Sequence, residues 1–344
     1  MWFDESRLDD EAALSTADLR LRGLAESGSR VRREAAAAAE AIEQAFTRAE
    51  GSGRPRAIVA AGPDSRLLRA VLEPVCPVPF VAWPSPGLPG WAGSLDLVVV
   101  LAPGGSDAGT ASAVAEANRR GCQVVVAAPQ SSLVAEHAEG RYATLVPVTT
   151  TDPLAIAVAV LTLIGRVSLG PETEAEEIAV ALDEVAISCG PRRDLAVNPA
   201  KGLAIALADA TPLVWGGSML AARAARRVAE SFRRASGRTA LAGDAEHLLP
   251  VLEAARPRSV FDDPFGEGAD GVVEPRPLLV LLDDGSHEDH VVALRRQLTD
   301  AADERGVRVE LLASDAPSDI ARYGSLLLQG RYAAEYLRLG LVED

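Results

Sequence analysis

A turn rich in glycine and short hydroxyl side chains could hold a phosphate group. Residues 97–117 read LVVVLAPGGSDAGTASAVAEA, an apolar β-branched segment, a turn with Gly105, Ser106 and Thr110, and an alanine-rich helical pattern. Backbone amides at a helix N-terminus bind phosphate, and hydroxyl side chains add donors. Asp107 in the same turn can instead cap the first amides, and its charge would repel a dianion. The turn is therefore either a phosphate site or a capped joint, and we favour the capped joint.

Other residues with reactive side chains are scattered along the chain. His287 and His290 lie beside several aspartates and could in principle bind a metal, but a solvated acidic helix start explains the segment better. The three cysteines, Cys76, Cys122 and Cys189, show neither a CxxC pair nor a Cys/His ligand spacing. We therefore expect no metal, no cofactor and no disulfide, and a reducing cytoplasm is the compartment that fits.

Composition and charge limit the classes of partner. The chain has 344 residues, of which 48% are apolar, enough for two domains with cores. Its formal net charge of −15 repels the phosphate backbone of nucleic acids and the anionic surface of membranes. Its first residues are acidic and lack the apolar core of a signal peptide, and no apolar run is long enough to cross a membrane. We expect a cytoplasmic protein that binds neither nucleic acid nor membrane.

Two series of short apolar runs, each alternating with helical patterns, must position these groups. The first-half runs are 54–62, 77–83, 95–103, 122–129 and 144–148, with helices at 29–48 and 154–166. The second-half runs are 211–217, 238–243, 259–264, 277–284 and 307–313. Continuous apolar strands that alternate with helices predict parallel sheets covered on both faces. We expect an α/β fold with a helical segment at 1–50, a first domain at 51–170, a helical linker at 171–200, a second domain at 201–322 and a C-terminal helix at 323–344.

Three segments carry a resemblance to a known family. They are DLVVVLAPGGSDAGTASAVAEANRRGCQVVVAA (96–128), NPAKGLAIALADATPLVWGG (198–217) and YGSLLLQGRYAAEYLRLGL (323–341), the last with the pattern Gly330, Tyr332, Tyr336 and Leu337. They resemble the sugar isomerase (SIS) superfamily, in particular the bifunctional phosphoglucose/phosphomannose isomerases. The resemblance implies two doubly wound parallel-sheet SIS-type domains with N- and C-terminal helices. It also implies a homodimer, because that family builds its site between subunits.

The resemblance assigns a role to the turn, but the family residues are largely replaced. The family loop reads Ser-x-Ser-Gly-x-Thr, and ungapped alignment puts Ala102, Gly104 and Asp107 at its hydroxyl positions. Gly105 alone keeps its type. If this loop is shifted relative to the family loop, Ser106 and Thr110 supply the hydroxyl groups and are the candidate sugar-phosphate ligands.

Two further family segments also differ. The family's second loop, Gly-x-Gly-Gly-Ser, is AGPDS here, so Gly62 and Ser65 remain as candidate ligands. Pro63 lacks an amide hydrogen and Asp64 adds a negative charge. The family's arginine that follows a proline is Leu154 in this chain, which removes a cationic partner for a phosphate or an enediolate.

The resemblance also points to a catalytic pair. Glu230 stands where the family has its catalytic base for enediol formation, and His247 where the family has the histidine that opens the sugar ring. Their polar flanking residues are replaced. Glu230 could instead pair with arginines of its own helix, and His247 could lie on the surface.

Three functional hypotheses remain open at this point. The one we favour is a carbohydrate-derivative-binding protein of carbohydrate metabolism, derived from phosphoglucose/phosphomannose isomerases, with degenerate or altered activity. The second is an active aldose–ketose isomerase on glucose 6-phosphate or mannose 6-phosphate. The third is a non-catalytic scaffold or regulatory partner of another protein.

Overall fold

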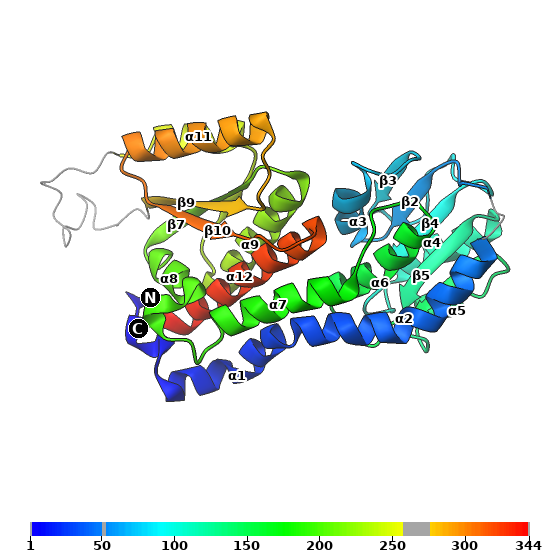
Figure 1. Ribbon diagram of the computed structural model, residues 1–344, viewed down its shortest axis with the longest axis horizontal. Helices are drawn as coiled ribbons and strands as arrows, with labels where there is room; N and C mark the ends of the chain where they lie inside the picture. The colour runs from blue at the N-terminus through cyan, green and yellow to red at the C-terminus, as the bar shows by residue number, and fades with distance from the viewer. Residues whose placement is uncertain (1, 50–52, 257–275, 343–344) are drawn as a thin grey trace, which may run out of the picture. The chain divides into compact units, whose positions relative to one another are not determined.

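The computed structural model of the chain describes residues 2–49, 53–256 and 276–342, and it divides into two compact units. One unit comprises residues 27–180, and its described residues form a sheet of five strands. The other comprises residues 1–26 and 181–344, and its described part contains a sheet of four strands (Figure 1). We call them the five-stranded unit and the four-stranded unit. The five segments expected from the sequence remain a prediction about domain boundaries.

The five-stranded unit is a parallel sheet in the order β3-β2-β4-β5-β6. Its strands are β2 (Ile58–Ala61), β3 (Phe80–Trp83), β4 (Leu97–Leu101), β5 (Gln123–Ala128) and β6 (Ala143–Pro147). Every residue of β2 and β4 is buried, as parallel strands covered on both faces require. All five strands coincide with the apolar runs predicted in the first half.

Helices cover both faces of this sheet. They are α2 (Ser27–Ala49), α3 (Ser65–Leu72), α4 (Ala108–Arg119), α5 (Leu133–Glu136) and α6 (Pro153–Arg166). Side chains of α4 and α5, such as Val114 and Val134, share a core with Val98 and Val100 of β4. On the other face α6 packs against β4 and β5, and α2 packs against α6. Pro153 begins α6, where its missing amide hydrogen costs nothing.

A buried carboxylate holds the loop before β4. Asp96 is fully buried and receives hydrogen bonds from the Arg56 guanidinium at 2.6 and 2.9 Å and from the Gly93 amide at 2.8 Å. Burial alone would raise the pKa of Asp96, but these hydrogen bonds and the Arg56 charge hold the pKa below its usual value. Asp96 is therefore charged in the folded chain at neutral pH.

The four-stranded unit has parallel strands in the order β10-β9-β7-β8. They are β7 (Ala210–Gly216), β8 (Leu241–Ala242), β9 (Arg276–Asp283) and β10 (Val309–Ala313). They coincide with four of the predicted second-half runs, and the run at 259–264 lies outside the described residues. The sequence-based expectation of an α/β fold with two doubly wound sheets is confirmed.

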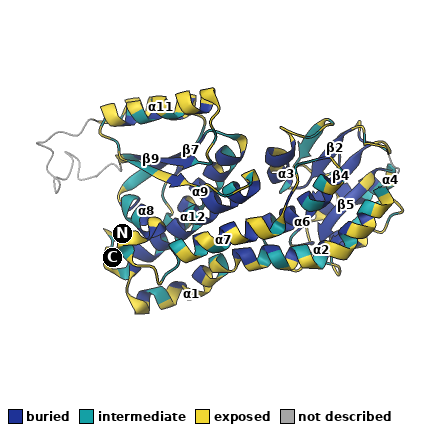
Figure 2. Ribbon diagram, in the orientation of Figure 1, coloured by how far each residue is buried: buried dark blue, intermediate teal, exposed yellow. Residues whose placement is uncertain are grey.

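Two helix layers enclose the four-stranded sheet. The helices are α8 (Pro199–Ala206), α9 (Met219–Ser236), α10 (Ala245–Glu253), α11 (Asp289–Glu304) and α12 (Asp319–Gly340). Figure 1 shows α11 on one side of the sheet and α9 and α12 on the other. Side chains of α10 and α11 share a core with Leu213, Trp215, Leu279 and Leu281, and the outer face of α11 is exposed (Figure 2).

The N-terminal residues belong to the four-stranded unit. They form β1 (Trp2–Phe3), a 3₁₀ helix (Glu5–Leu8) and α1 (Glu11–Ala25). β1 pairs antiparallel with β11 (Leu341–Val342), so the first and last described residues lie together. A second 3₁₀ helix (Leu195–Val197) precedes α8, and α7 (Ala175–Cys189) carries the chain from the five-stranded unit into the four-stranded unit.

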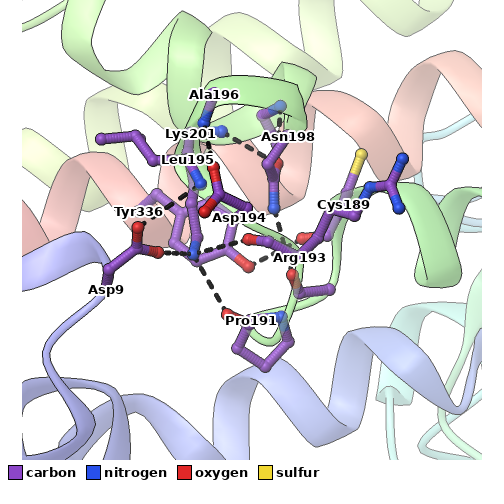
Figure 3. Close-up of polar contacts among 12 residues, drawn as sticks. Asp9, Cys189, Pro191, Arg193, Asp194, Leu195, Ala196, Asn198, Lys201 and Tyr336 are labelled. Atoms are coloured by element: carbon purple, nitrogen blue, oxygen red, sulfur yellow. Dashed lines mark hydrogen bonds and ion pairs between the residues drawn. The ribbon is translucent and has the colours of Figure 1, made fainter.

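The sole lysine of the chain is part of the framework. Lys201 is fully buried, and its ammonium donates to the Asp9 carboxylate and to the carbonyl oxygens of Pro191 at 3.1 Å and Arg193 at 3.0 Å (Figure 3). The ring centroid of Tyr336 lies 5.6 Å from the Nζ atom. Three acceptors and an aromatic face satisfy the ammonium, so Lys201 secures the N-terminal segment.

The other motif residues of the two C-terminal segments are structural as well. Asn198 caps α8 by accepting from its first amides, and the Tyr336 hydroxyl donates to the carbonyl oxygen of Cys189 at 2.7 Å. A side chain at Gly330 would overlap Val228, so this glycine brings α12 against α9. The motifs are therefore explained by packing within the four-stranded unit.

Candidate functional site

The order of the strands in the five-stranded sheet indicates a candidate ligand site at the carboxyl ends of β2 and β4, which we call the edge of this sheet. From β2 the chain passes to β3 on one side and then returns to β4 on the other side. The loops that follow β2 and β4 therefore flank a point where the strand order reverses, which is where ligands bind in open α/β sheets. Gly62, Ser65, Gly105, Ser106 and Thr110, the predicted phosphate ligands, all lie in these loops or in the first turns of the helices that follow them.

The β4–α4 turn is capped by its own carboxylate. Asp107 is the N-cap of α4, and its Oδ2 accepts from the Thr110 amide at 2.7 Å and from the Thr110 hydroxyl at 2.6 Å. These two hydrogen bonds lower the pKa of Asp107, so the carboxylate is charged at neutral pH. The capping role expected for Asp107 is confirmed, and it takes donors that a phosphate would use.

The β2–α3 loop touches this turn. Gly62 has φ +92°, and a Cβ atom there would lie 3.2 Å from the Thr110 Oγ1 atom. Ser65 is 1% exposed, and its Oγ atom has no hydrogen-bond partner among the described residues. The Nε1 atom of Trp83, at the end of neighbouring β3, is buried and likewise has no partner in the described part of the chain. Since buried polar atoms are nearly always paired, these two groups point to a ligand or to water.

The remaining two turn residues differ in exposure. Gly105 has φ +62°, and a side chain there would overlap Ser132, so the turn needs glycine at this position. Ser106, in contrast, is exposed. Gly105 therefore shapes the turn, whereas Ser106 lies at its surface.

The loop between β6 and α6 has its amides occupied too. Glu34 of α2 is 1% exposed and accepts from the Thr149 amide at 3.0 Å and the Thr150 amide at 2.5 Å. Asp152 accepts from the Leu154 amide at 3.0 Å. Leu154, which replaces the family arginine, is buried. Carboxylates hold the loop, and the cationic side chain nearest to it in these contacts, Arg30 of α2, is paired with Asp152 at 2.8 Å.

The four-stranded sheet has an equivalent edge that sequence reasoning did not single out. The strand order reverses between β7 and β9, so the loops that follow these strands flank it. There the Ser218 hydroxyl donates to the Asp284 carboxylate, and Arg295 pairs with Asp283. Ser218 also caps α9 by accepting from the Ala221 amide at 3.0 Å. The sequence signals for this edge were the two glycines before Ser218, at positions 216 and 217, and the adjacent aspartates Asp283 and Asp284.

The predicted catalytic residues lie in the four-stranded unit. Glu230 is in α9, where one carboxylate oxygen accepts from Arg227 at 2.6 Å and the other forms an ion pair with Arg234 at 2.5 Å. The His247 side chain, in α10, is 70% exposed and lies 3.9 Å from the Glu246 carboxylate. Their roles in catalysis remain predictions. Both carboxylate oxygens of Glu230 are engaged by arginines, and the imidazole of His247 forms no hydrogen bond with the residues that the structure describes.

No group of three or more histidine, cysteine, aspartate or glutamate residues in the described ranges could hold a metal ion. Among the helices that the structure describes, none combines the length and the apolar character needed to cross a membrane.

Comparisons with known proteins agree with this fold. Residues 196–340 match the family model of the bacterial phospho-glucose isomerase C-terminal SIS domain. No protein of curated function matches the chain by sequence.

Several solved structures share the fold along most of the chain. The C-terminal domain of glucosamine-fructose-6-phosphate aminotransferase from Francisella tularensis has 11% identity and a TM-score of 0.62, over 92% of this chain and 94% of that one. Tagatose-6-phosphate ketose/aldose isomerase from Escherichia coli has 13% identity and a TM-score of 0.58, over 92% and 94%. A glucose-6-phosphate isomerase-like protein from Thermus thermophilus has 19% identity and a TM-score of 0.50, over 84% and 82%. At these identities the likeness shows the fold alone.

Proposed function

Because the chain belongs to the sugar isomerase (SIS) superfamily, we propose that it binds a carbohydrate derivative and no longer isomerises sugar phosphates. The observation that carries this proposal is the Asp107 cap, which takes the amide and the hydroxyl of Thr110. An incoming phosphate would have to displace a carboxylate of its own charge from those donors. The β4–α4 turn is therefore a joint rather than a phosphate cradle.

The surroundings of the proposed catalytic pair support the loss of isomerase activity. A general base must have a free oxygen within hydrogen-bond distance of the substrate proton. Both oxygens of Glu230 are held by arginines in the same helix. His247 is mostly exposed, whereas proton transfer at a ring oxygen needs an imidazole fixed against the substrate.

The edge of the five-stranded sheet still favours an uncharged ligand. Ser65 and Trp83 offer buried polar atoms without a partner in the described residues. A sugar hydroxyl can pair with a serine hydroxyl and with an indole N–H, and such pairing would remove the cost of burying them unsatisfied. An unphosphorylated carbohydrate would not meet the repulsion of Asp107.

The activity half of the proposal is tested by a coupled assay for interconversion of glucose 6-phosphate, mannose 6-phosphate and fructose 6-phosphate. We expect no conversion above the buffer control for the full chain. Turnover that is lost in Glu230→Gln and retained in the matched control Glu246→Gln would refute the proposal. The control residue is an exposed glutamate of α10, so its substitution tests for general effects of removing a carboxylate.

The binding half is tested by thermal unfolding with unphosphorylated hexoses and N-acetylhexosamines. A ligand at ten times its Kd stabilises the native state by about 1.4 kcal/mol, a rise of about 2 to 6 °C in Tm. We expect this rise in the wild type and in Ser106→Ala, whose side chain is exposed, and its loss in Ser65→Ala. If no sugar raises Tm, or if Ser65→Ala responds like the wild type, the assignment of this edge is wrong.

A further inference from the structure

A groove of about 550 Å³ runs between α10 and α11 in the four-stranded unit. Its α11 wall consists of residues three or four positions apart, from Asp289 in the first turn to Glu304 in the last. Residues at this spacing lie on one stripe of a helix. Because α11 has 16 residues, the groove follows it for about 24 Å. Leu249 and Glu253 of α10 form the other wall. We call this surface the α10–α11 groove.

The floor of the α10–α11 groove is apolar and open to solvent. Leu249 and Ala301 are half-buried and pack against the core beneath them. Val292 is 41% exposed, and the neighbouring Ala293 is exposed as well. Figure 2 shows how much of α11 is exposed. A strip of apolar side chains therefore lies along the groove with water on its outer side.

The rim of the groove is acidic. Glu253, Asp289, Asp300 and Glu304 line it together with one arginine, Arg296. The Arg296 Nε atom lies 3.6 Å from an Asp300 carboxylate oxygen, so these two charges balance each other. The other three carboxylates form no ion pair with any residue that the structure describes. The groove therefore combines an apolar floor with an excess of negative charge along its rim.

We propose that the α10–α11 groove binds a basic amphipathic helix of a partner protein. A helix laid along α11 would cover Val292 and Ala293 with its apolar face, as in other complexes in which a helix lies in a groove. Its lysines and arginines would face Glu253 at one wall and Glu304 at the other, and such charge complementarity favours association and selects the partner. The proposal goes beyond carbohydrate binding, because it concerns a different unit of the chain.

The charge of the chain itself argues against two other occupants. A second copy in a two-fold symmetric contact would place the same acidic rim against itself. The segment 257–275, which links α10 to β9, contains five carboxylate side chains and one arginine, so it has the same sign of charge as the rim. A basic helix from another protein is the occupant whose charge complements the groove.

The test is fluorescence anisotropy of a labelled synthetic peptide titrated with the full chain near physiological ionic strength. The peptide has about 15 residues, enough to span the groove as a helix, with leucines on one face and lysines beside them. The reference peptide has the same composition in a scrambled order that disperses the leucines around the helix. We expect micromolar binding of the amphipathic peptide and binding at least about tenfold weaker for the scrambled one.

Charge reversals at the rim locate the binding site. Glu253 and Glu304 are the last residues of their helices, where a lysine is favoured by the helix dipole, so Glu253→Lys and Glu304→Lys should fold. We expect each to weaken binding of the amphipathic peptide at least about fivefold. The matched control is Asp303→Lys, an exposed residue of α11 outside the groove, which should bind within about twofold of the wild type. Circular dichroism establishes that each variant folds.

A second pair of variants tests the apolar floor. Val292→Ser removes the exposed apolar side chain and should weaken binding at least about threefold. Leu294→Ser, at a residue of α11 that is 36% exposed and does not line the groove, is its control and should leave binding unchanged.

Three outcomes would overturn the proposal. They are absence of binding, equal binding of the scrambled peptide, and a loss in Asp303→Lys as large as that in Glu304→Lys, because the last two show attraction by charge alone. A dimer in sedimentation that dissociates in Glu304→Lys would identify a second copy as the occupant and would also overturn it. None of these outcomes bears on the proposed function, which is tested by sugars and by Ser65→Ala in the five-stranded unit.

Discussion

The strongest test of the turn is removal of the Asp107 carboxylate. In Asp107→Ala the Thr110 amide loses its acceptor, while the Thr110 hydroxyl can turn to a carbonyl oxygen of the preceding turn. Loss of a helix N-cap costs about 0.5–2 kcal/mol, and we expect a value near the upper end because Thr110 is 2% exposed. In Asp107→Thr, which restores the residue of the family loop, the hydroxyl can still cap, so the cost should be a few tenths of a kcal/mol, on the order of 0.5.

The same carboxylate makes a pH-dependent contribution. Because the folded-state pKa of Asp107 is lowered, its contribution is complete above the unfolded pKa of about 3.9 and is lost as the pH falls through the folded value. Asp107 is exposed, so the ionic part is screened by solvent and the cap energy dominates.

Urea unfolding of the wild type, Asp107→Ala and Asp107→Thr at pH 7 and pH 3 measures both effects. We expect Asp107→Ala to have a lower midpoint at pH 7 with an unchanged slope, and the gap to the wild type to shrink at pH 3. A loss below about 0.3 kcal/mol at pH 7 would mean that the carboxylate does not hold the Thr110 amide. The turn would then be open to a phosphate, contrary to our reasoning.

Three other substitutions test the packing around the site. Gly105→Ala places a side chain against Ser132 in a left-handed backbone, so we expect a loss of about 2–4 kcal/mol in urea unfolding, and a neutral result would contradict the turn geometry. Asp96→Asn should cost about 2 kcal/mol at pH 7. Because the pKa of Asp96 is lowered, that cost should diminish as the pH falls below about 4, and a cost independent of pH would be inconsistent with a charged Asp96. Lys201 should resist amine-reactive esters in the native chain. If Asp9→Ala costs about 1.4 kcal/mol of stability around Lys201, labelling of this lysine, measured by peptide mass spectrometry, should become about tenfold faster. Equal labelling rates in the wild type and in Asp9→Ala would contradict the ion pair.

Local signals allowed the sheets and the cap to be predicted. Parallel strands buried on both faces are continuous apolar runs, which is why LVVVL in β4 could be recognised from the sequence. An aspartate at the first position before an alanine-rich helix caps through a contact three residues away, as Asp107 does with Thr110. Such features depend on neighbours in the chain and need no knowledge of packing.

Long-range contacts between elements could not be predicted in this way. Val228 of α9 and Gly330 of α12 are far apart in the sequence, and they meet because a glycine at position 330 allows the two helices to approach. The role of Glu34 in holding Thr149 and Thr150 likewise depends on how α2 crosses the end of β6. In both cases tertiary packing set the partner, and the local sequence did not indicate it.

The most direct test of the account is a crystal structure of the full chain soaked with tungstate, a heavy analogue of phosphate located by anomalous scattering. We expect no tungsten peak within hydrogen-bond distance of the Thr110 amide, because the Asp107 carboxylate accepts from it. A peak at Thr110, with the Asp107 carboxylate displaced, would show that the β4–α4 turn still binds phosphate and would contradict the account.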